Sequence, residues 1–443
     1  MAWQEDYKRK VTTARDALRA VESGMRVYIH GNSAYPQELV DALAERAPYV
    51  RDVEVVHLLT PGRASYAVEG LEKNFRHNAM FMGANVRKAV SEGRADYTPI
   101  HLSEIEGLFT SGQMPIDVAL IHVSPPDAHG FVSLGVAVET TLTAAKCARF
   151  VVAQVNDQMP RTYGNTFLHV NEIDAFIETS SPLPESEKPE ITDIHRAIAK
   201  HCASLIEDGA TLQTGIGGIP DAILPFLSDR KDLGIHTELL SDGAIPLVEA
   251  GVINCRRKTF HPNKIILGFL IGTRKIYNFA DNNPLLEFHP TYYVNDPFNI
   301  ARNDNMVAIN SAIEVDLTGQ VCSDSVGQNF YSGFGGQVDF IYGASRSKGG
   351  KPIIALPSTA KNDTISKIVP ILKPGAGVVT SRALVHYVIT EYGIAYLHGR
   401  NIRQRAEALI QIAHPKFRNE LYEHCNRMNW FSRPEMAVAG TAR

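Results

Sequence analysis

The sequence lacks the long apolar runs that membrane proteins contain. No stretch of about 18 consecutive apolar residues occurs, and residues 1–21 lack the apolar core of a signal peptide. Basic residues are not concentrated either, because the formal net charge is −4 and no sustained basic run is present. We therefore predict a cytoplasmic protein with neither membrane nor nucleic acid as a main partner.

Cysteine is scarce, and its spacing excludes several kinds of site. The five cysteines are scattered without a C-x-x-C pair, which argues against a disulfide framework, a structural zinc site or a dithiol redox centre. A dispersed set of this kind is typical of reduced thiols in a protein core. The five are Cys147, Cys202, Cys255, Cys322 and Cys425.

Common catalytic and nucleotide-binding motifs are also missing. The chain has no G-x-S-x-G elbow for a hydrolase serine, although a triad assembled from distant residues stays open. The first of its glycine clusters matches neither the G-x-G-x-x-G pattern nor the Walker pattern. These absences disfavour a nucleotide-binding interpretation.

The sequence does contain a regular alternation of short β-rich and longer helical segments. Its 443 residues suggest two or three domains at roughly 150 residues each, and its 44% apolar and 21% charged residues are ordinary for a soluble protein. A helical pattern at 36–47 separates the first strands, so we predict an α/β fold with a mainly parallel sheet. The strands predicted in the first half are 26–32, 53–59, 117–125 and 149–156.

Residues 180–193 interrupt this alternation. They contain three prolines, four acidic residues and no apolar periodicity, which predicts an exposed linker between two domains. The predicted domains are residues 1–183 and 194–443.

The second half begins with a predicted helix at 191–209. Residues 306–324 predict a hairpin around 317–320, which would make the second sheet mixed. The other strands predicted here are 211–217, 234–240, 263–272, 291–296 and 351–358.

One acidic residue lies in an unusual place. Glu238 is near the C-terminal end of the apolar strand 234–240, which is followed by a turn signal at 241–243. Glu238 is therefore a candidate catalytic residue, and the alternative is an ordinary surface carboxylate at a strand end. His236 is expected on the same strand face, where a packing or orienting role is favoured over a zinc pair.

Two glycine clusters could approach a ligand. Gly215, Gly217 and Gly218 follow a strand and precede a helical pattern, an arrangement that binds anions or phosphates or forms a tight packing turn. Gly335 and Gly336 lie in a polar loop that suits either a ligand contact or a hinge.

A lysine follows the last of these predicted strands. Lys361 lies just after strand 351–358, in a loop at the kind of strand end where α/β folds bind ligands. It is a candidate for a phosphate or pantetheine contact, and the alternative is a solvated lysine.

Several blocks in the same order along nearly the whole chain resemble class I CoA-transferases of the acetyl-CoA hydrolase/transferase family. The resemblance is closest to the 4-hydroxybutyrate and butyrate:acetyl-CoA transferase branch. The blocks are residues 124–135, 153–165, 212–222, 236–243, 332–340, 357–370 and 388–418.

The resemblance implies a fold of two related open α/β domains with CoA between them. It implies that Glu238 is the nucleophile of a ping-pong CoA-transferase, which attacks a short-chain acyl-CoA such as acetyl-CoA and forms a covalent glutamyl-CoA thioester. Coenzyme A would be a substrate, with no permanently bound cofactor and no metal. A homo-oligomer, a dimer or tetramer, is also implied.

The same resemblance implies roles for the loops. Gly335 and Gly336 contact CoA, with the Gly336 amide as the oxyanion donor. Lys361 matches a CoA-contacting lysine, but relatives commonly have glycines after it, so the backbone at Asn362 and Asp363 is expected to differ. The first loop contributes Gly215, Ile216, Gly217, Gly218 and Ile219.

Two alternatives stay open. An acyl-CoA hydrolase could use the same glutamate, and an inactive CoA-binding protein is a third interpretation, which the intact Glu238 disfavours. The acid is expected to have two to five carbons, with loops 30–36 and 159–165 in its pocket. Candidate acids are acetate, butyrate, 4-hydroxybutyrate, itaconate and succinate, and a dicarboxylate would need a cation such as Arg63, Arg87 or Arg161.

Overall fold

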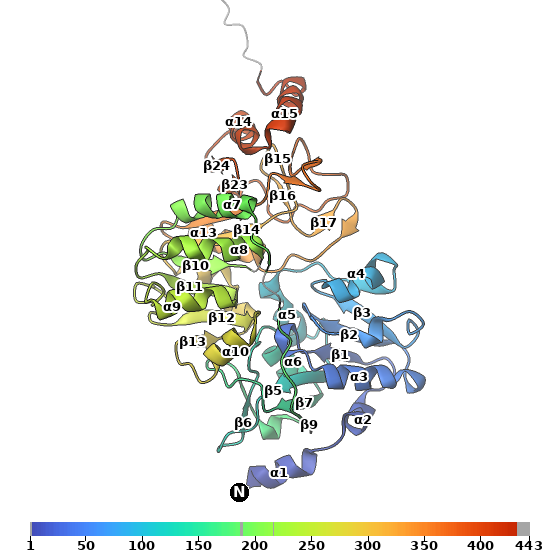
Figure 1. The fold of residues 1–443 in the computed structure, drawn as a ribbon. Coiled ribbons are helices and arrows are strands. Elements are labelled where there is room, and N and C mark those ends of the chain that lie inside the picture. Colours follow the sequence, from blue (N-terminus) through green and yellow to red (C-terminus); the bar gives the residue numbers. More distant parts are fainter. Residues whose placement is uncertain (1, 187–188, 216, 432–443) are drawn as a thin grey trace, which may run out of the picture.

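The computed structural model describes residues 2–186, 189–215 and 217–431. Its main elements form two open sheets surrounded by helices (Figure 1), and the linker predicted at 180–193 falls between the two sheets in the sequence. The predicted α/β class is therefore confirmed. We propose that residues 1–183 and 194–443 form the two domains.

The first sheet has seven strands in the order β4-β3-β2-β1-β5-β7-β9, and every pairing is parallel. All residues of β5 are buried, as expected when helices cover both faces of a parallel sheet. The four predicted strands are confirmed as β1 (Arg26–Ile29), β2 (Val53–His57), β5 (Val118–Val123) and β7 (Phe150–Asn156). The sheet also contains β3 (Phe75–Ala79), β4 (Ala95–Tyr97) and β9 (Ala175–Thr179).

Helices of the first half pack around this sheet. The helical pattern at 36–47 is confirmed as α3 (Gln37–Glu45), whose buried side chains include Leu39 and Leu43. The others are α1 (Ala2–Lys10), α2 (Ala14–Ala17), α4 (Ala84–Ser91), α5 (Ile105–Thr110) and α6 (Thr141–Cys147).

The second sheet has eight strands in the order β13-β12-β11-β10-β14-β19-β23-β24. It is parallel except for its last pair, which is antiparallel, so the predicted mixed sheet is confirmed. The strands are β10 (Thr211–Thr214), β11 (Gly234–Leu240), β12 (Ile265–Leu270), β13 (Leu286–Phe288), β14 (Met306–Ser311), β19 (Lys351–Ala355), β23 (Tyr387–Thr390) and β24 (Gly393–Tyr396).

The hairpin prediction was right about the turn but wrong about the sheet. Residues 317–320 connect β15 (Glu314–Asp316) to β16 (Val321–Cys322), and this pair belongs to a separate three-stranded sheet with β22 (Ile368–Val369). The preceding β14 pairs with β10 and β19 instead. The mixed character of the main sheet therefore comes from β23 and β24.

The strand predicted at 291–296 is wrong. This segment forms the short helix α11 (Thr291–Val294), although its aromatic and β-branched residues favour strands. The physical reason is a tertiary contact, because Glu106 accepts hydrogen bonds from the Thr291 hydroxyl at 2.8 Å and the Tyr292 N–H at 2.9 Å. These bonds satisfy donors at the start of the helix.

The helix predicted at 191–209 is confirmed as α7 (Asp193–Ser204), and Thr192 caps its N-terminus. The remaining helices of this half are α8 (Gly218–Ile223), α9 (Ile245–Glu249), α10 (Arg274–Ala280), α12 (Pro297–Ala301), α13 (Gln337–Arg346), α14 (Ile402–Ile412) and α15 (Pro415–Arg427). Among the described residues, no helix has both the length and the apolar character needed to span a membrane.

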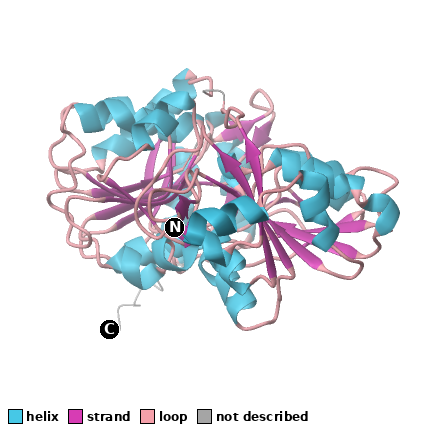
Figure 2. Ribbon diagram, turned by 90° about the horizontal axis from the view of Figure 1, so that it is seen from below, coloured by secondary structure: helices cyan, strands magenta, loops and turns pink. Residues whose placement is uncertain are grey.

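The two sheets lie side by side and share a buried core (Figure 2). Backbone contacts also join the second sheet to loops of the first half, because Leu270 of β12 donates to Val136 at 2.8 Å and Phe288 of β13 donates to Tyr163 at 2.8 Å. Part of the C-terminal edge of the second sheet is thereby held against the first half of the chain.

The connecting segment is less free than the sequence predicts. Leu183 is buried, the Tyr277 hydroxyl donates to the Pro184 carbonyl at 2.6 Å, and the Ser186 N–H donates to Gly272 at 2.9 Å. The described part of this linker is thus fixed to the second sheet's surroundings.

The cysteines are free, and all except the half-buried Cys147 are buried, as predicted.

Candidate active site

Glu238 lies in β11, near the end that faces the first half of the chain. The strand is flanked by β10 and β12, and the Glu238 side chain is partly buried. Asn295, the residue that ends α11, donates a hydrogen bond from Nδ2 to Glu238 Oε2 at 3.1 Å. The carboxylate therefore has a fixed orientation.

Gly336, in another segment of the chain, contacts the same carboxylate. It precedes α13, and its backbone N–H interacts with Glu238. A Cβ atom on Gly336 would lie 2.1 Å from Glu238 Oε2 and 2.2 Å from Asn295 Nδ2. Only glycine leaves room for this close approach.

Burial controls the charge of Glu238. It raises the pKa of the carboxyl to about 7, and the hydrogen bonds from Asn295 and Gly336 partly oppose this effect while the nearby Asp339 adds to it. The group can thus be ionised at neutral pH, yet it is poorly solvated. A desolvated carboxylate in a fixed position can act as a nucleophile or a general base.

Three further carboxyl groups surround this position. Glu106 and Glu139 are almost completely buried, and burial raises the pKa of each to about 8. Burial also raises the pKa of Asp339, which lies in the first turn of α13. Sequence reasoning did not identify these three residues or Asn295, because they come from four separate segments.

The first glycine loop lies at the end of β10, next to β11. The Thr237 hydroxyl donates to the Thr214 carbonyl at 3.2 Å, which joins the loop to the strand that carries Glu238. A Cβ atom on Gly215 or Gly217 would meet no atom within 4 Å, so both could approach a ligand. Ile216 lies outside the described residues.

The two remaining residues of this loop begin α8. A Cβ atom on Gly218 would lie 2.4 Å from the His195 ring, so this glycine allows close packing against α7. The Ile219 side chain is buried in the core, which leaves only its backbone for a ligand. Their predicted role in CoA binding stays a prediction.

Gly335 and Lys361 occupy different parts of the second half. The Gly335 carbonyl accepts a hydrogen bond from the Leu102 N–H at 3.3 Å, beside the Glu238 site. Lys361 is exposed in the turn between β20 (Thr359–Ala360) and β21 (Ile365–Ser366). Since β19 is separated from β11 by β14 and β10, the structure does not bring Lys361 to Glu238.

The backbone of the Lys361 turn is unusual. Lys361, Asn362 and Asp363 have φ values of 51°, 52° and 58°, which lie in the left-handed region that glycine prefers. Each non-glycine residue there costs roughly 1 kcal/mol. The turn therefore keeps a conformation suited to glycine, although residues 361–363 include no glycine.

His236 and the three candidate arginines have other partners. His236 is fully buried, and its Nε2 lies 2.8 Å from the Val294 carbonyl. Both observations agree with the packing role that the sequence favours. Arg63 pairs with Asp41 and Arg161 with Asp127, whereas Arg87 stacks over Tyr331. In the part of the chain that the structure describes, no group of three or more His, Cys, Asp or Glu residues could hold a metal ion.

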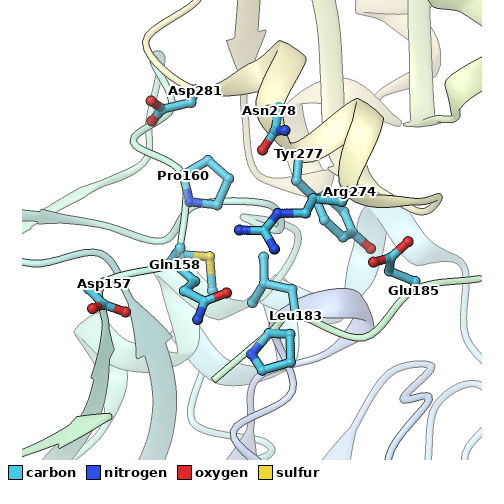
Figure 3. A pocket seen from close by; sticks show the side chains of 11 residues that line it. Asp157, Gln158, Pro160, Leu183, Glu185, Arg274, Tyr277, Asn278 and Asp281 are labelled. Carbon is cyan, nitrogen blue, oxygen red and sulfur yellow. The ribbon is translucent and has the colours of Figure 1, made fainter. Parts of the chain in front are cut away.

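Cavities lie on both sides of the connecting segment. Asn32 and Ser33 of loop 30–36 line one of about 360 Å³, together with Thr60 and Ile271. Loop 159–165 borders another of about 260 Å³, into which Arg274 points (Figure 3). Glu238 lines neither cavity.

Two glycine substitutions distinguish the role of the Gly336 loop from that of the Gly215 loop. Gly336→Ala is expected to lower kcat by about 100-fold, because the added methyl group displaces the Glu238 carboxylate or Asn295 and removes a preorganised donor. Gly215→Ala meets open space, so it should leave kcat within about threefold and raise the KM for acyl-CoA if this loop contacts the ligand. Steady-state rates for both variants test this.

Thermal unfolding of the two variants is the control. Both should unfold within a few degrees of the unmodified protein, since neither glycine has its φ in the left-handed region. A Gly336→Ala variant with unchanged kcat would show that the Gly336 contact is not used.

Comparisons with known proteins were made for the whole chain. Residues 1–184 match the model described as acetyl-CoA hydrolase/transferase N-terminal domain, and residues 272–425 match the corresponding C-terminal domain. The chain is 52% identical to the 4-hydroxybutyrate coenzyme A transferase of Clostridium kluyveri, over 95% of this chain and 98% of that protein.

Two further similarities cover most of the chain. A succinyl-CoA:acetate/propanoyl-CoA:succinate CoA transferase of Fasciola hepatica is 50% identical over 90% of this chain and 84% of its own. The crystal structure of RipA from Yersinia pestis superposes with a TM-score of 0.92 at 35% identity, covering 97% of this chain and all of that one.

Proposed function

The chain belongs to the acetyl-CoA hydrolase/transferase family and is a CoA-transferase, and we propose that it transfers CoA between a short-chain acyl-CoA and a small carboxylic acid through Glu238. The observation that carries this proposal is the geometry at Glu238. A partly buried carboxylate with a pKa of about 7 is held by Asn295 and by the Gly336 backbone. No other described carboxylate combines these features.

The first half of the reaction forms a covalent intermediate. The Glu238 carboxylate attacks the thioester carbonyl and the C–S bond breaks. The CoA thiolate is released, and an acyl-glutamyl anhydride is formed. The thiolate then attacks the glutamyl carbonyl and releases the acid, which leaves a glutamyl-CoA thioester. An incoming carboxylate reverses these steps and leaves as the new acyl-CoA, so the thioester energy is conserved.

Each attack on a carbonyl produces an oxyanion that needs hydrogen-bond donors. Asn295 Nδ2 donates to Glu238 Oε2 and the Gly336 N–H interacts with the same carboxylate, so either donor can stabilise the charge that develops on the glutamyl oxygen. They are fixed before the reaction and partly shielded from water. This arrangement favours transfer over hydrolysis.

The remaining predicted residues have supporting roles in this proposal. Gly215 and Gly217 leave open space that the pantetheine or phosphate groups of CoA would occupy, and the exposed Lys361 would contact CoA farther from Glu238. CoA is a substrate here, not a resident cofactor. A cytoplasmic location and a homo-oligomer stay predictions of the sequence.

The acid is proposed to be small. Loop 30–36 stays a proposed part of the pocket for an acid of two to five carbons, although the cavity of about 360 Å³ that Asn32 and Ser33 line does not include Glu238. Among relatives, one is named for 4-hydroxybutyrate and another for succinate and acetate, which have this size, and a third is named for cyclohexane-1-carboxylate, so the family position does not select one acid.

Trapping of the intermediate tests the proposal. After incubation with acetyl-CoA and borohydride, the peptide that carries Glu238 should be about 14 Da lighter, because the glutamyl thioester is reduced to an alcohol. The change should be absent from Glu238→Gln and should be reversed by adding a carboxylate before borohydride.

The same experiment distinguishes the hydrolase alternative. Stimulation of acetyl-CoA consumption by a carboxylate acceptor, with formation of the new acyl-CoA, supports transfer. Consumption that ignores the acceptor would indicate hydrolysis. If Glu238 is labelled, water intercepts the glutamyl intermediate; if Glu238 is unmodified, water attacks directly or the nucleophile lies elsewhere.

A further inference from the structure

Residues 102–106 of the first half contact both segments that hold Glu238. This short stretch comprises the 3₁₀ turn Leu102–Glu104 and the start of α5. It lies far from Glu238 in the sequence, and its buried side chains include Leu102 and Glu106.

The first contact leads to Asn295. Glu106 Oε2 accepts hydrogen bonds from the Thr291 hydroxyl at 2.8 Å and the Tyr292 N–H at 2.9 Å, which fixes the start of α11. Asn295 ends this helix, and its N–H donates to the Thr291 carbonyl at 2.8 Å. Because α11 is a single turn, the position of Thr291 determines the position of the Asn295 amide.

The second contact leads to Gly336. Ser103 donates to Asp339 twice, from its N–H at 3.1 Å and from its hydroxyl at 2.8 Å. Leu102 donates from its N–H to the Gly335 carbonyl at 3.3 Å. Asp339 and Gly335 lie on either side of Gly336, so these bonds fix the loop and the first turn of α13.

We infer that Glu106 and Ser103 are positioning residues for catalysis, because one segment of the first half holds both donors, Asn295 and Gly336, against Glu238. This inference rests on the proposed function of Glu238. Neither residue touches the reacting atoms. They act by keeping the two donors within hydrogen-bond distance when the oxyanion forms, which matters because donor placement is sensitive to small displacements.

The chemistry of Glu106 suggests a precise comparison. Burial raises its pKa to about 8, so the carboxyl is largely neutral at pH 7. Glutamine then resembles it in charge and size and keeps an acceptor oxygen for Thr291 and Tyr292. Leucine has a similar volume without an acceptor, and it leaves two donors unpaired.

The experiment measures the single-turnover rate at which glutamyl-CoA forms, together with the dissociation constant of acyl-CoA. Glu106→Leu is expected to lower the rate by about 10- to 100-fold, Thr291→Val by about tenfold and Ser103→Ala by about fivefold, while acyl-CoA binding changes less than threefold. Glu106→Gln should restore the rate to within about threefold of the unmodified enzyme.

Matched controls address stability. Thr291→Val removes one hydroxyl and keeps the β-branched shape, so it tests the contact even if Glu106→Leu does not fold. Ser345→Ala removes a hydroxyl bond to the Tyr342 carbonyl on the same helix as Asp339 and should leave the rate unchanged.

The outcomes separate this inference from the proposed function. If the unmodified enzyme labels Glu238 and Thr291→Val and Ser103→Ala label it equally fast, the positioning role is wrong. It is also wrong if Glu106→Gln is as slow as Glu106→Leu, or if the rates fall only through weaker binding. If the unmodified enzyme never labels Glu238, the proposed function fails and this inference fails with it.

Discussion

Replacing Glu238 with glutamine will lower the kcat for CoA transfer by about 10⁴-fold or more and leave the fold intact. Glutamine keeps the volume of the side chain and an oxygen that accepts from Asn295 and Gly336, so the local packing survives. It cannot form the anhydride, because a neutral amide is a poor nucleophile. Loss of a covalent nucleophile typically has an effect of this size.

The measurement is the initial rate of acyl-CoA formation from acetyl-CoA and a carboxylate acceptor. Glu238→Ala should lose as much activity as Glu238→Gln, because neither side chain can attack the thioester. Glu249→Gln, at the exposed end of α9, is the matched control and should keep full activity. Transfer by Glu238→Gln at more than about 1% of the normal rate would place the nucleophile elsewhere.

Replacing Glu139 with glutamine is expected to remove the contribution of one proton to the pH dependence of the protein's stability. Burial raises the pKa of Glu139 from its ordinary value of 4.5 to about 8, although the Gly31 N–H and Asn32 oppose this effect. Between these two values the folded state binds a proton that the unfolded state has lost. The free energy of unfolding therefore falls as pH rises through this window, and glutamine removes that loss.

The size of the effect follows from the proton difference. One proton corresponds to about 1.4 kcal/mol of free energy of unfolding per pH unit. Between pH 6 and pH 8 the free energy of unfolding of the unmodified protein should therefore fall by about 2 kcal/mol more than that of Glu139→Gln. Glutamine occupies the same position, including the left-handed backbone of residue 139, where φ is 30°. The comparison thus isolates the charge.

Urea unfolding at pH 6 and pH 8 gives, for each protein, the change in the free energy of unfolding between these two pH values. Glu249→Gln serves again as the control and should show the pH dependence of the unmodified protein. Parallel pH dependence of Glu139→Gln and the unmodified protein would mean that Glu139 is ionised in the folded state.

The sequence determined much of the fold because local patterns have local causes. Apolar strands alternating with amphipathic helices predicted an α/β fold with mainly parallel strands, and a turn signal placed Glu238 near the end of its strand. The glycine loops were recognisable for the same reason, since glycine marks positions where the backbone turns or must lie close to another group. The prediction failed at 291–296, where Glu106 in the other half accepts hydrogen bonds from Thr291 and Tyr292 and so stabilises a helix although the residues favour a strand.

Only the tertiary structure decided what surrounds Glu238. Asn295, Glu106, Glu139 and Asp339 have no local signature, because their roles depend on contacts between segments that are distant in the sequence. Burial of a carboxyl group, and so its pKa, results from the packing of both sheets around it. The sequence by itself determined which residue could be the nucleophile, and the packing of the two halves determined its charge and its donors.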